Sequence, residues 1–97
     1  MNQIEIESTL RGLKQKLQNE FHVSRIGLFG SVLTDDFTDN SDVDVLVDID
    51  PQYKSYETML ELKQMLKTQI CREIDLVFSD TINPIVKMHI GDNITYV

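Results

Sequence analysis

The spacing of apolar residues predicts three helices. Apolar positions recur every three or four residues over residues 5–20 and again over residues 56–70, which is the pattern of one buried helix face. A third helix is predicted over residues 84–90, because Asn83 is a favourable N-cap, a proline follows it and a glycine comes after the last position. These helices are expected to pack their apolar faces on one core.

The stretches between the helices predict strands. Alternating or continuous apolar runs occur at residues 23–29, 43–49, 72–78 and 94–97. A Gly-Ser turn, a short helix and a polar loop over residues 34–41 separate the first two runs. This order of elements predicts an α/β (α+β) fold, with a small mixed β-sheet and flanking helices over its core face.

The second predicted strand begins with two aspartates one residue apart. Successive side chains of a strand point to opposite faces, so Asp42 and Asp44 share one face while valines fill the other. Two carboxylates this close repel each other unless a cation lies between them. A hard divalent cation with oxygen ligands, such as Mg²⁺, is the natural counter-charge, so we predict metal binding at this pair.

The net charge of -7 is concentrated around this strand. No Lys or Arg occurs between Arg25 and Lys54, whereas seven aspartates do; outside this segment nine acids balance nine bases. The seven are Asp35, Asp36, Asp39, Asp42, Asp44, Asp48 and Asp50. We interpret the first three as solvated loop charges and the last two as solubilising charges at the end of the strand.

Gly30 and Ser31 follow the first predicted strand. Glycine permits a positive φ angle or close approach of a ligand, and the first N–H groups of a helix bind anions such as phosphates. The alternative is a plain strand-to-helix turn with a serine cap. A gap of ten residues separates Ser31 from Asp42, and phosphate binding is favoured through the family signature that this spacing forms.

Gly30-Ser31, a gap of ten residues and Asp42-Val43-Asp44 together form a known signature. The chain resembles the minimal nucleotidyltransferase (MNT) family of the DNA polymerase beta-like nucleotidyltransferase superfamily, which includes the MntA-type antitoxins. The resemblance covers roughly residues 20–97 and favours a single minimal nucleotidyltransferase domain over residues 1–97.

The resemblance implies a protein adenylyltransferase that transfers AMP from ATP to a hydroxyl, with two Mg²⁺ ions as cofactors. It implies Asp42, Asp44 and Asp75 as catalytic and metal-binding residues, and Gly30 and Ser31 as nucleotide-binding residues. The acceptor implied for an antitoxin of this type is a tyrosine of a HEPN-domain toxin, an RNase. A structural salt bridge from Asp75 to Arg72 or Lys87 is the alternative role for the third carboxylate.

One departure from the family pattern bears on function. Many members carry a basic cluster directly after the Gly-Ser pair, where this chain has Val32, Leu33, Thr34 and Asp35. Without that cluster, a non-catalytic antitoxin or binding module that neutralises its partner by contact alone is the alternative function. A small-molecule nucleotidyltransferase is less favoured, because such enzymes usually add a second domain for the acceptor.

Composition limits the expected number of domains, the cellular location and the kinds of partner. With 97 residues, 41% hydrophobic and 26% charged, the chain fits one globular domain. No apolar run approaches the about 20 residues that span a bilayer, and the polar start differs from a signal peptide, so a cytoplasmic location without membrane contact is expected. The acidic balance disfavours stable nucleic-acid binding. The single Cys71 is predicted to be a buried small hydrophobe. The sequence does not decide whether the chain forms homo-oligomers or hetero-oligomers.

Overall fold

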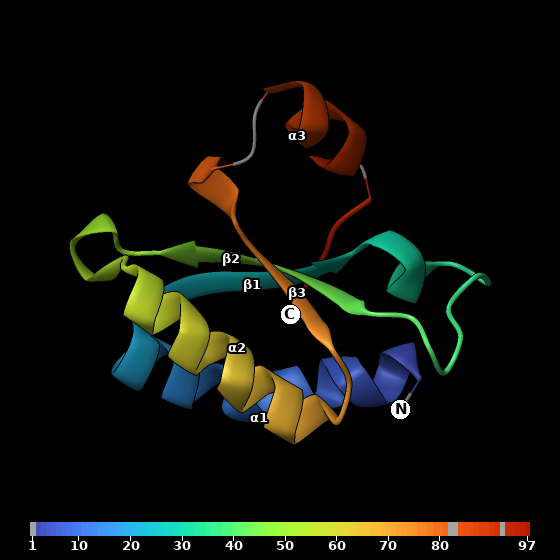
Figure 1. Ribbon diagram of the computed structural model, residues 1–97, viewed down its shortest axis with the longest axis horizontal. Helices are drawn as coiled ribbons and strands as arrows, with labels where there is room; N and C mark the ends of the chain where they lie inside the picture. Colours follow the sequence, from blue (N-terminus) through green and yellow to red (C-terminus); the bar gives the residue numbers. More distant parts are fainter. Residues whose placement is uncertain (1, 82–83, 92) are drawn as a thin grey trace.

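The computed structural model describes residues 2–81, 84–91 and 93–97. One mixed sheet separates two sets of helices (Figure 1). The two long helices, α1 and α2, cover one face of the sheet, and the short α3 lies over the other face. The predicted α/β fold with a small mixed sheet and flanking helices is therefore confirmed, but the expectation that all three helices cover the core face is wrong for α3, which lies over the opposite face (Figure 1).

The elements follow the order predicted from the apolar pattern. The helices are α1 (Gln3–Phe21), α2 (Tyr56–Ile70) and α3 (Pro84–Gly91), with 3₁₀ turns η1 (Gly30–Leu33), η2 (Pro51–Tyr53) and η3 (Ser79–Thr81). The strands are β1 (Val23–Phe29), β2 (Val43–Ile49), β3 (Ile74–Phe78) and β4 (Thr95–Tyr96). The third strand begins two residues later than predicted, because the chain is still turning out of α2 at residues 71–72. The predicted cap Asn83 lies outside the described residues.

The sheet order is β3-β2-β1-β4. β1 pairs antiparallel with β2 and with β4, whereas β2 and β3 are parallel. A parallel pair needs a long crossover connection, and α2 supplies it. The register places Phe29 of β1 beside Asp44 of β2, and Asp44 beside Asp75 of β3.

The core lies between the sheet and the two long helices. Its fully buried side chains come from one stripe of each helix and from alternate positions of β1 and β2: Ile6, Leu10, Leu17, Ile26, Leu28, Val43, Val45, Val47, Leu62, Leu66 and Ile70. The opposite face of β2 carries Asp42, Asp44 and Asp48. Burial of the valine face therefore fixes the direction in which the aspartates point.

Both long helices begin and end with local signals. Asn2 and Glu5 form a capping box at the start of α1, and the Ser55 hydroxyl accepts the Thr58 N–H at the start of α2. At the other ends, His22 and Cys71 adopt left-handed backbone conformations, with φ of 56° and 61°.

Two sequence interpretations are corrected. Cys71 is exposed, not buried, because it is the residue after the last turn of α2, where the left-handed backbone carries its side chain away from the core. Asp48 is not simply a solubilising charge: its carboxylate lies 2.6 Å from Arg25 Nε and accepts a hydrogen bond from the Ser79 hydroxyl. This pair and hydrogen bond join β1, β2 and η3.

No helix in the described part of the chain is both long enough and apolar enough to cross a membrane.

Two leucines of α2 test the location of the core. Leu62 is fully buried, whereas Leu60, on the same helix, is 45% exposed. We expect Leu62→Ala to lower the free energy of unfolding by about 2–4 kcal/mol, through lost burial and a residual cavity. The matched variant Leu60→Ala should change it by about 0.5 kcal/mol or less. Urea unfolding followed by circular dichroism measures both, and equal losses would contradict this description of the core.

Candidate active site

Three neighbouring strands bring the predicted residues to one place. Gly30 directly follows the last residue of β1, which pairs with Asp44, and Asp44 in turn pairs with Asp75. Asp42 lies two residues before Asp44, on the same side of the strand. The Gly-Ser turn, the aspartate pair and the third carboxylate, separate in sequence, therefore meet at one end of the sheet.

Gly30 has its backbone against the Asp44 carboxylate. Its φ is +74°, and a Cβ atom built on it would lie 2.1 Å from Asp44 Oδ2. That distance is far below any real contact of a Cβ atom, so the carboxylate occupies space that a side chain would need. Both the backbone conformation and the close approach require glycine at this position.

The local interactions of Asp44 raise its pKa from 3.8 to about 6. Partial burial is the largest cause, followed by the charge of Asp75 and a hydrogen bond with the Asp75 side chain; the Asp42 charge contributes less. The Ser31 main-chain N–H donates to the Asp44 carboxylate and acts in the opposite direction. In this structure the anion held by the Gly-Ser turn is thus the protein's own carboxylate.

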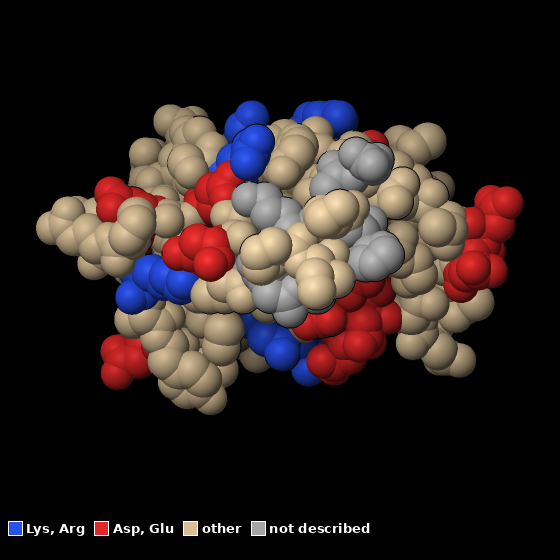
Figure 2. All heavy atoms as spheres, turned by 90° about the horizontal axis from the view of Figure 1, so that it is seen from above, with Lys and Arg blue, Asp and Glu red and all other residues tan. Residues whose placement is uncertain are grey.

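The acidic side chains around Asp44 differ in exposure and lie in separate groups on the surface (Figure 2). Asp42 and Asp75 are exposed, whereas Asp44 is half-buried. Seen from the α3 side, acidic side chains form separate groups, one of them at the end where the loop between η1 and β2 lies (Figure 2). Asp35, Asp36 and Asp39 of that loop are exposed, in line with the interpretation that they are solvated.

The donor set suits a hard cation. Partial burial and the neighbouring Asp75 carboxyl raise the pKa of Asp44, and a cation between the two carboxylates would relieve their repulsion when both are ionised. As the side chains lie, no group of three His, Cys, Asp or Glu among the described residues is arranged to hold a metal ion. Metal ligation by all three aspartates therefore stays a prediction that needs side-chain movements.

The alternative salt bridge from Asp75 to Arg72 does not form. Arg72 Nη2 donates instead to the carbonyl oxygens of Thr38 and Ser41. The side chain of Lys87, the other partner considered for Asp75, lies outside the described residues. Within the described part of the chain, the Asp75 carboxyl interacts with the Asp44 carboxyl.

Two features near the site were missed by sequence reasoning. One is the role of Arg72, whose contacts link segments more than thirty positions apart. The other is a groove of about 330 Å³ beside Gly30, with walls from η1 and α3. Its lining residues are Phe29, Gly30, Leu33, Thr34, Ile90 and Asn93. No local motif indicates either feature, because both depend on how distant elements pack.

The Gly-Ser turn and the carboxylates lie together at one end of a mixed sheet, as the resemblance to a nucleotidyltransferase implies. The chain belongs to the polymerase beta nucleotidyltransferase family, whose model matches residues 11–95. The resemblance drawn from the Gly-Ser and Asp-x-Asp signature is therefore confirmed.

Relatives of known sequence extend the comparison. The chain is 36% identical over 95 residues to a protein of Methanocaldococcus jannaschii that is provisionally named a protein adenylyltransferase; the match covers 96% of this chain and 95% of the relative. It is 32% identical over 93 residues to the protein adenylyltransferase MntA of Thermococcus cleftensis, covering 96% and 93%.

Solved structures share the fold. One, described provisionally as a minimal nucleotidyltransferase, superposes with a TM-score of 0.82 at 19% identity and covers 98% of this chain and 95% of the other. A second is the complex of a tri-AMPylated HEPN toxin of Shewanella oneidensis with an MNT antitoxin, with a TM-score of 0.69 at 19% identity, covering 97% and 70%. The sheet and its helices are thus those of a minimal nucleotidyltransferase.

Two glycines offer a matched test of the turn. Gly30→Ala should lower the free energy of unfolding and displace the Asp44 carboxylate, because the new methyl group meets Oδ2 and the positive φ becomes strained. Gly12→Ala, in the middle of α1 with no atom within 4 Å of the new methyl group, should raise stability by about 0.5–1 kcal/mol. Thermal unfolding measures both variants, and a Gly30→Ala protein as stable as the wild type would contradict the close approach.

The raised pKa of Asp44 predicts a pH-dependent stability. The folded protein holds this proton more tightly than the unfolded chain, so the wild type loses stability as the pH rises through the window from about 4 to about 6. Asp44→Asn removes the charge, so without divalent cations it should be about 1–2 kcal/mol more stable than the wild type near pH 8, allowing for solvent screening. Near pH 4 the difference should vanish. Urea unfolding at both pH values measures it, and a pH-independent difference would contradict the assignment.

Proposed function

We propose that this chain is a protein adenylyltransferase that transfers AMP from ATP to a hydroxyl of a partner protein. The proposal rests on one observation above all: Asp44 and Asp75 are held side by side, next to the Gly-Ser turn. Membership of the nucleotidyltransferase family and the names of the two archaeal relatives support the same reaction.

In this reaction the acceptor oxygen attacks the α-phosphorus of ATP. The bond from that phosphorus to the bridging oxygen breaks, and pyrophosphate leaves. Asp75, the third aspartate of the cluster, would accept the proton of the attacking hydroxyl or orient that hydroxyl. Asp42, Asp44 and Asp75 would hold magnesium, with two ions expected, and the metal would supply stabilisation of the charge on the attacking and leaving oxygens. A pKa of about 6 leaves Asp44 mostly ionised at neutral pH, as a metal ligand must be.

The Gly-Ser turn is proposed to bind the phosphates of ATP. Its Ser31 N–H already binds an anionic oxygen, that of Asp44, and the hydroxyl of the same residue is available beside it. The groove on the other side of Gly30 offers apolar walls from Phe29, Leu33 and Ile90. A flat purine base would fit such walls better than the charged phosphates would.

The proposed acceptor is a tyrosine of a HEPN-type toxin, which makes this chain an antitoxin. The support is the shared fold with the MNT antitoxin found in complex with a tri-AMPylated HEPN toxin, together with the MntA relative.

Aspartate variants test the reaction. The purified chain is incubated with Mg²⁺, labelled ATP and a co-expressed HEPN-domain protein, and mass spectrometry counts added AMP groups. Asp42→Asn and Asp44→Asn should abolish labelling, and Asp75→Asn should slow it by at least about 100-fold, the size of a lost general base. Asp39→Asn, on the exposed loop, is the charge-matched control and should label normally.

The same variants separate catalysis from contact. A toxin that stays active with Asp42→Asn but is silenced by the wild type supports adenylylation. Silencing by both proteins without any added AMP would favour the contact-only antitoxin, and unchanged labelling by the variants would refute the assigned site.

A further inference from the structure

The acidic loop between η1 and β2 is tied down by an arginine from a different part of the chain. Arg72, after the last turn of α2, donates from Nη2 to the carbonyl oxygen of Thr38 and, over 2.6 Å, to that of Ser41. Its guanidinium also lies 4.3 Å from the centre of the Phe37 ring. Three contacts to residues 37–41 come from one half-buried side chain.

The loop has a compact structure of its own at the point where Arg72 binds. The Thr38 N–H donates to the Ser41 hydroxyl over 3.0 Å, and the Ser41 N–H donates back to the Thr38 carbonyl over 3.1 Å. Arg72 binds the carbonyls at both ends of this turn. Both hydrogen bonds come from Nη2, whose two N–H groups are fixed in the guanidinium plane, and the same plane lies over the Phe37 ring. A lysine ammonium has no such plane, so it cannot reproduce all three contacts as well.

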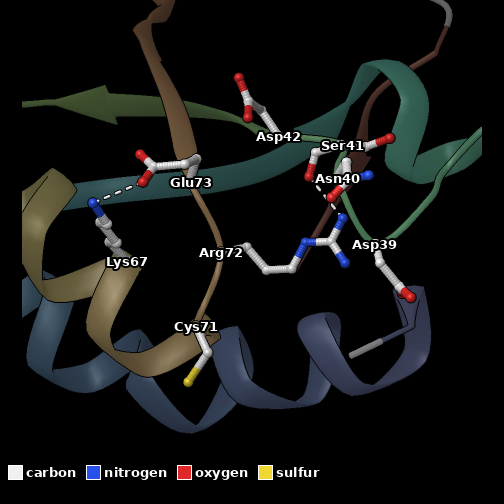
Figure 3. A pocket seen from close by; sticks show the side chains of 8 residues that line it. All are labelled: Asp39, Asn40, Ser41, Asp42, Lys67, Cys71, Arg72 and Glu73. Carbon is white, nitrogen blue, oxygen red and sulfur yellow. Dashed lines mark hydrogen bonds and ion pairs between the residues drawn. The ribbon is translucent and has the colours of Figure 1, made fainter.

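Asp42 is the next residue after this turn and is held from both sides. Before it, the Ser41 carbonyl binds Arg72; after it, the Val43 N–H donates to the Glu73 carbonyl over 2.9 Å. Figure 3 shows the Arg72 guanidinium reaching Ser41, while the Asp42 side chain points away from it. Arg72 therefore fixes the backbone of Asp42 without neutralising its carboxylate.

We propose that Arg72 is a positioning residue for Asp42: by fixing the loop, it holds that carboxylate where a divalent cation can bind. The inference rests on the proposed function, in which Asp42 is a metal ligand. Partners that orient metal ligands typically contribute about 10–100-fold to metal affinity. We expect Arg72→Ala to weaken binding of a divalent cation by at least about tenfold.

The direction of this effect separates positioning from simple electrostatics. Removing a positive charge near an acidic site favours cation binding through long-range attraction, so charge loss alone would tighten it. A second groove, of about 410 Å³, lies beside Asp42 and is lined by both Arg72 and Lys67. Lys67→Ala is the matched control, because it removes the same charge from the same groove. Lys67 pairs over 2.8 Å with Glu73 rather than with the loop. We expect Lys67→Ala to bind the cation as well as the wild type or better.

The test measures Mn²⁺ binding to the full chain by electron paramagnetic resonance, with a non-hydrolysable ATP analogue present. Labelling of the HEPN protein at graded Mg²⁺ concentrations gives a second readout: Arg72→Ala should raise the Mg²⁺ concentration for half-maximal rate. Arg72→Lys keeps the charge but loses the planar donor group, so its affinity should lie between those of Arg72→Ala and the wild type. If Arg72→Ala fails to fold, Arg72→Lys alone tests the positioning role.

Each outcome bears on one of the two proposals. Wild-type or tighter Mn²⁺ binding by folded Arg72→Ala, or wild-type binding by Arg72→Lys, would overturn the positioning role while the wild type still labels its partner. Equal weakening in Lys67→Ala and Arg72→Ala would overturn it too, because a general effect on the groove would then suffice. A wild type that neither binds Mn²⁺ nor transfers AMP would refute the proposed function itself.

Discussion

Repulsion between two carboxylates is the constraint on which this structure depends. The parallel register of β2 and β3 places Asp44 directly beside Asp75, and partial burial makes the proximity more costly. The core holds them there, because the alternate positions of β2 are the valines that α1 and α2 cover. Moving the aspartates apart would require moving buried side chains. The hydrophobic face of the sheet thus maintains an unfavourable arrangement on the other face.

Much of this arrangement can be predicted from local patterns. The alternation in β2 and the helical spacing of α2 gave the correct bounds for both elements, because each has one clearly apolar side. The meeting of Gly30 with Asp44 also follows from the sequence, since a hairpin-like connection returns β2 beside β1. The signature recognised in the chain encodes this geometry.

What escaped prediction depends on contacts between distant segments. Cys71 is apolar in type, so local reasoning buries it, but the left-handed turn at the end of α2 exposes it. Arg72 has no spacing relation to the loop that it binds, and Asp48 finds Arg25 only because the strands pair. Which partner a charged side chain contacts depends on the tertiary structure, and the periodicity of the sequence does not predict it.

All the proposed catalytic groups lie in the segment from Gly30 to Asp75, whereas α1 contributes buried leucines and an isoleucine to the core. Substitutions within α1 are therefore expected to change the stability of the folded protein more than the chemistry of the proposed site. In general, a change of about 1–2 kcal/mol in the free energy of unfolding can shift cellular abundance several-fold. The first helix thus provides a separate means by which evolution can adjust dosage while the chemistry stays intact.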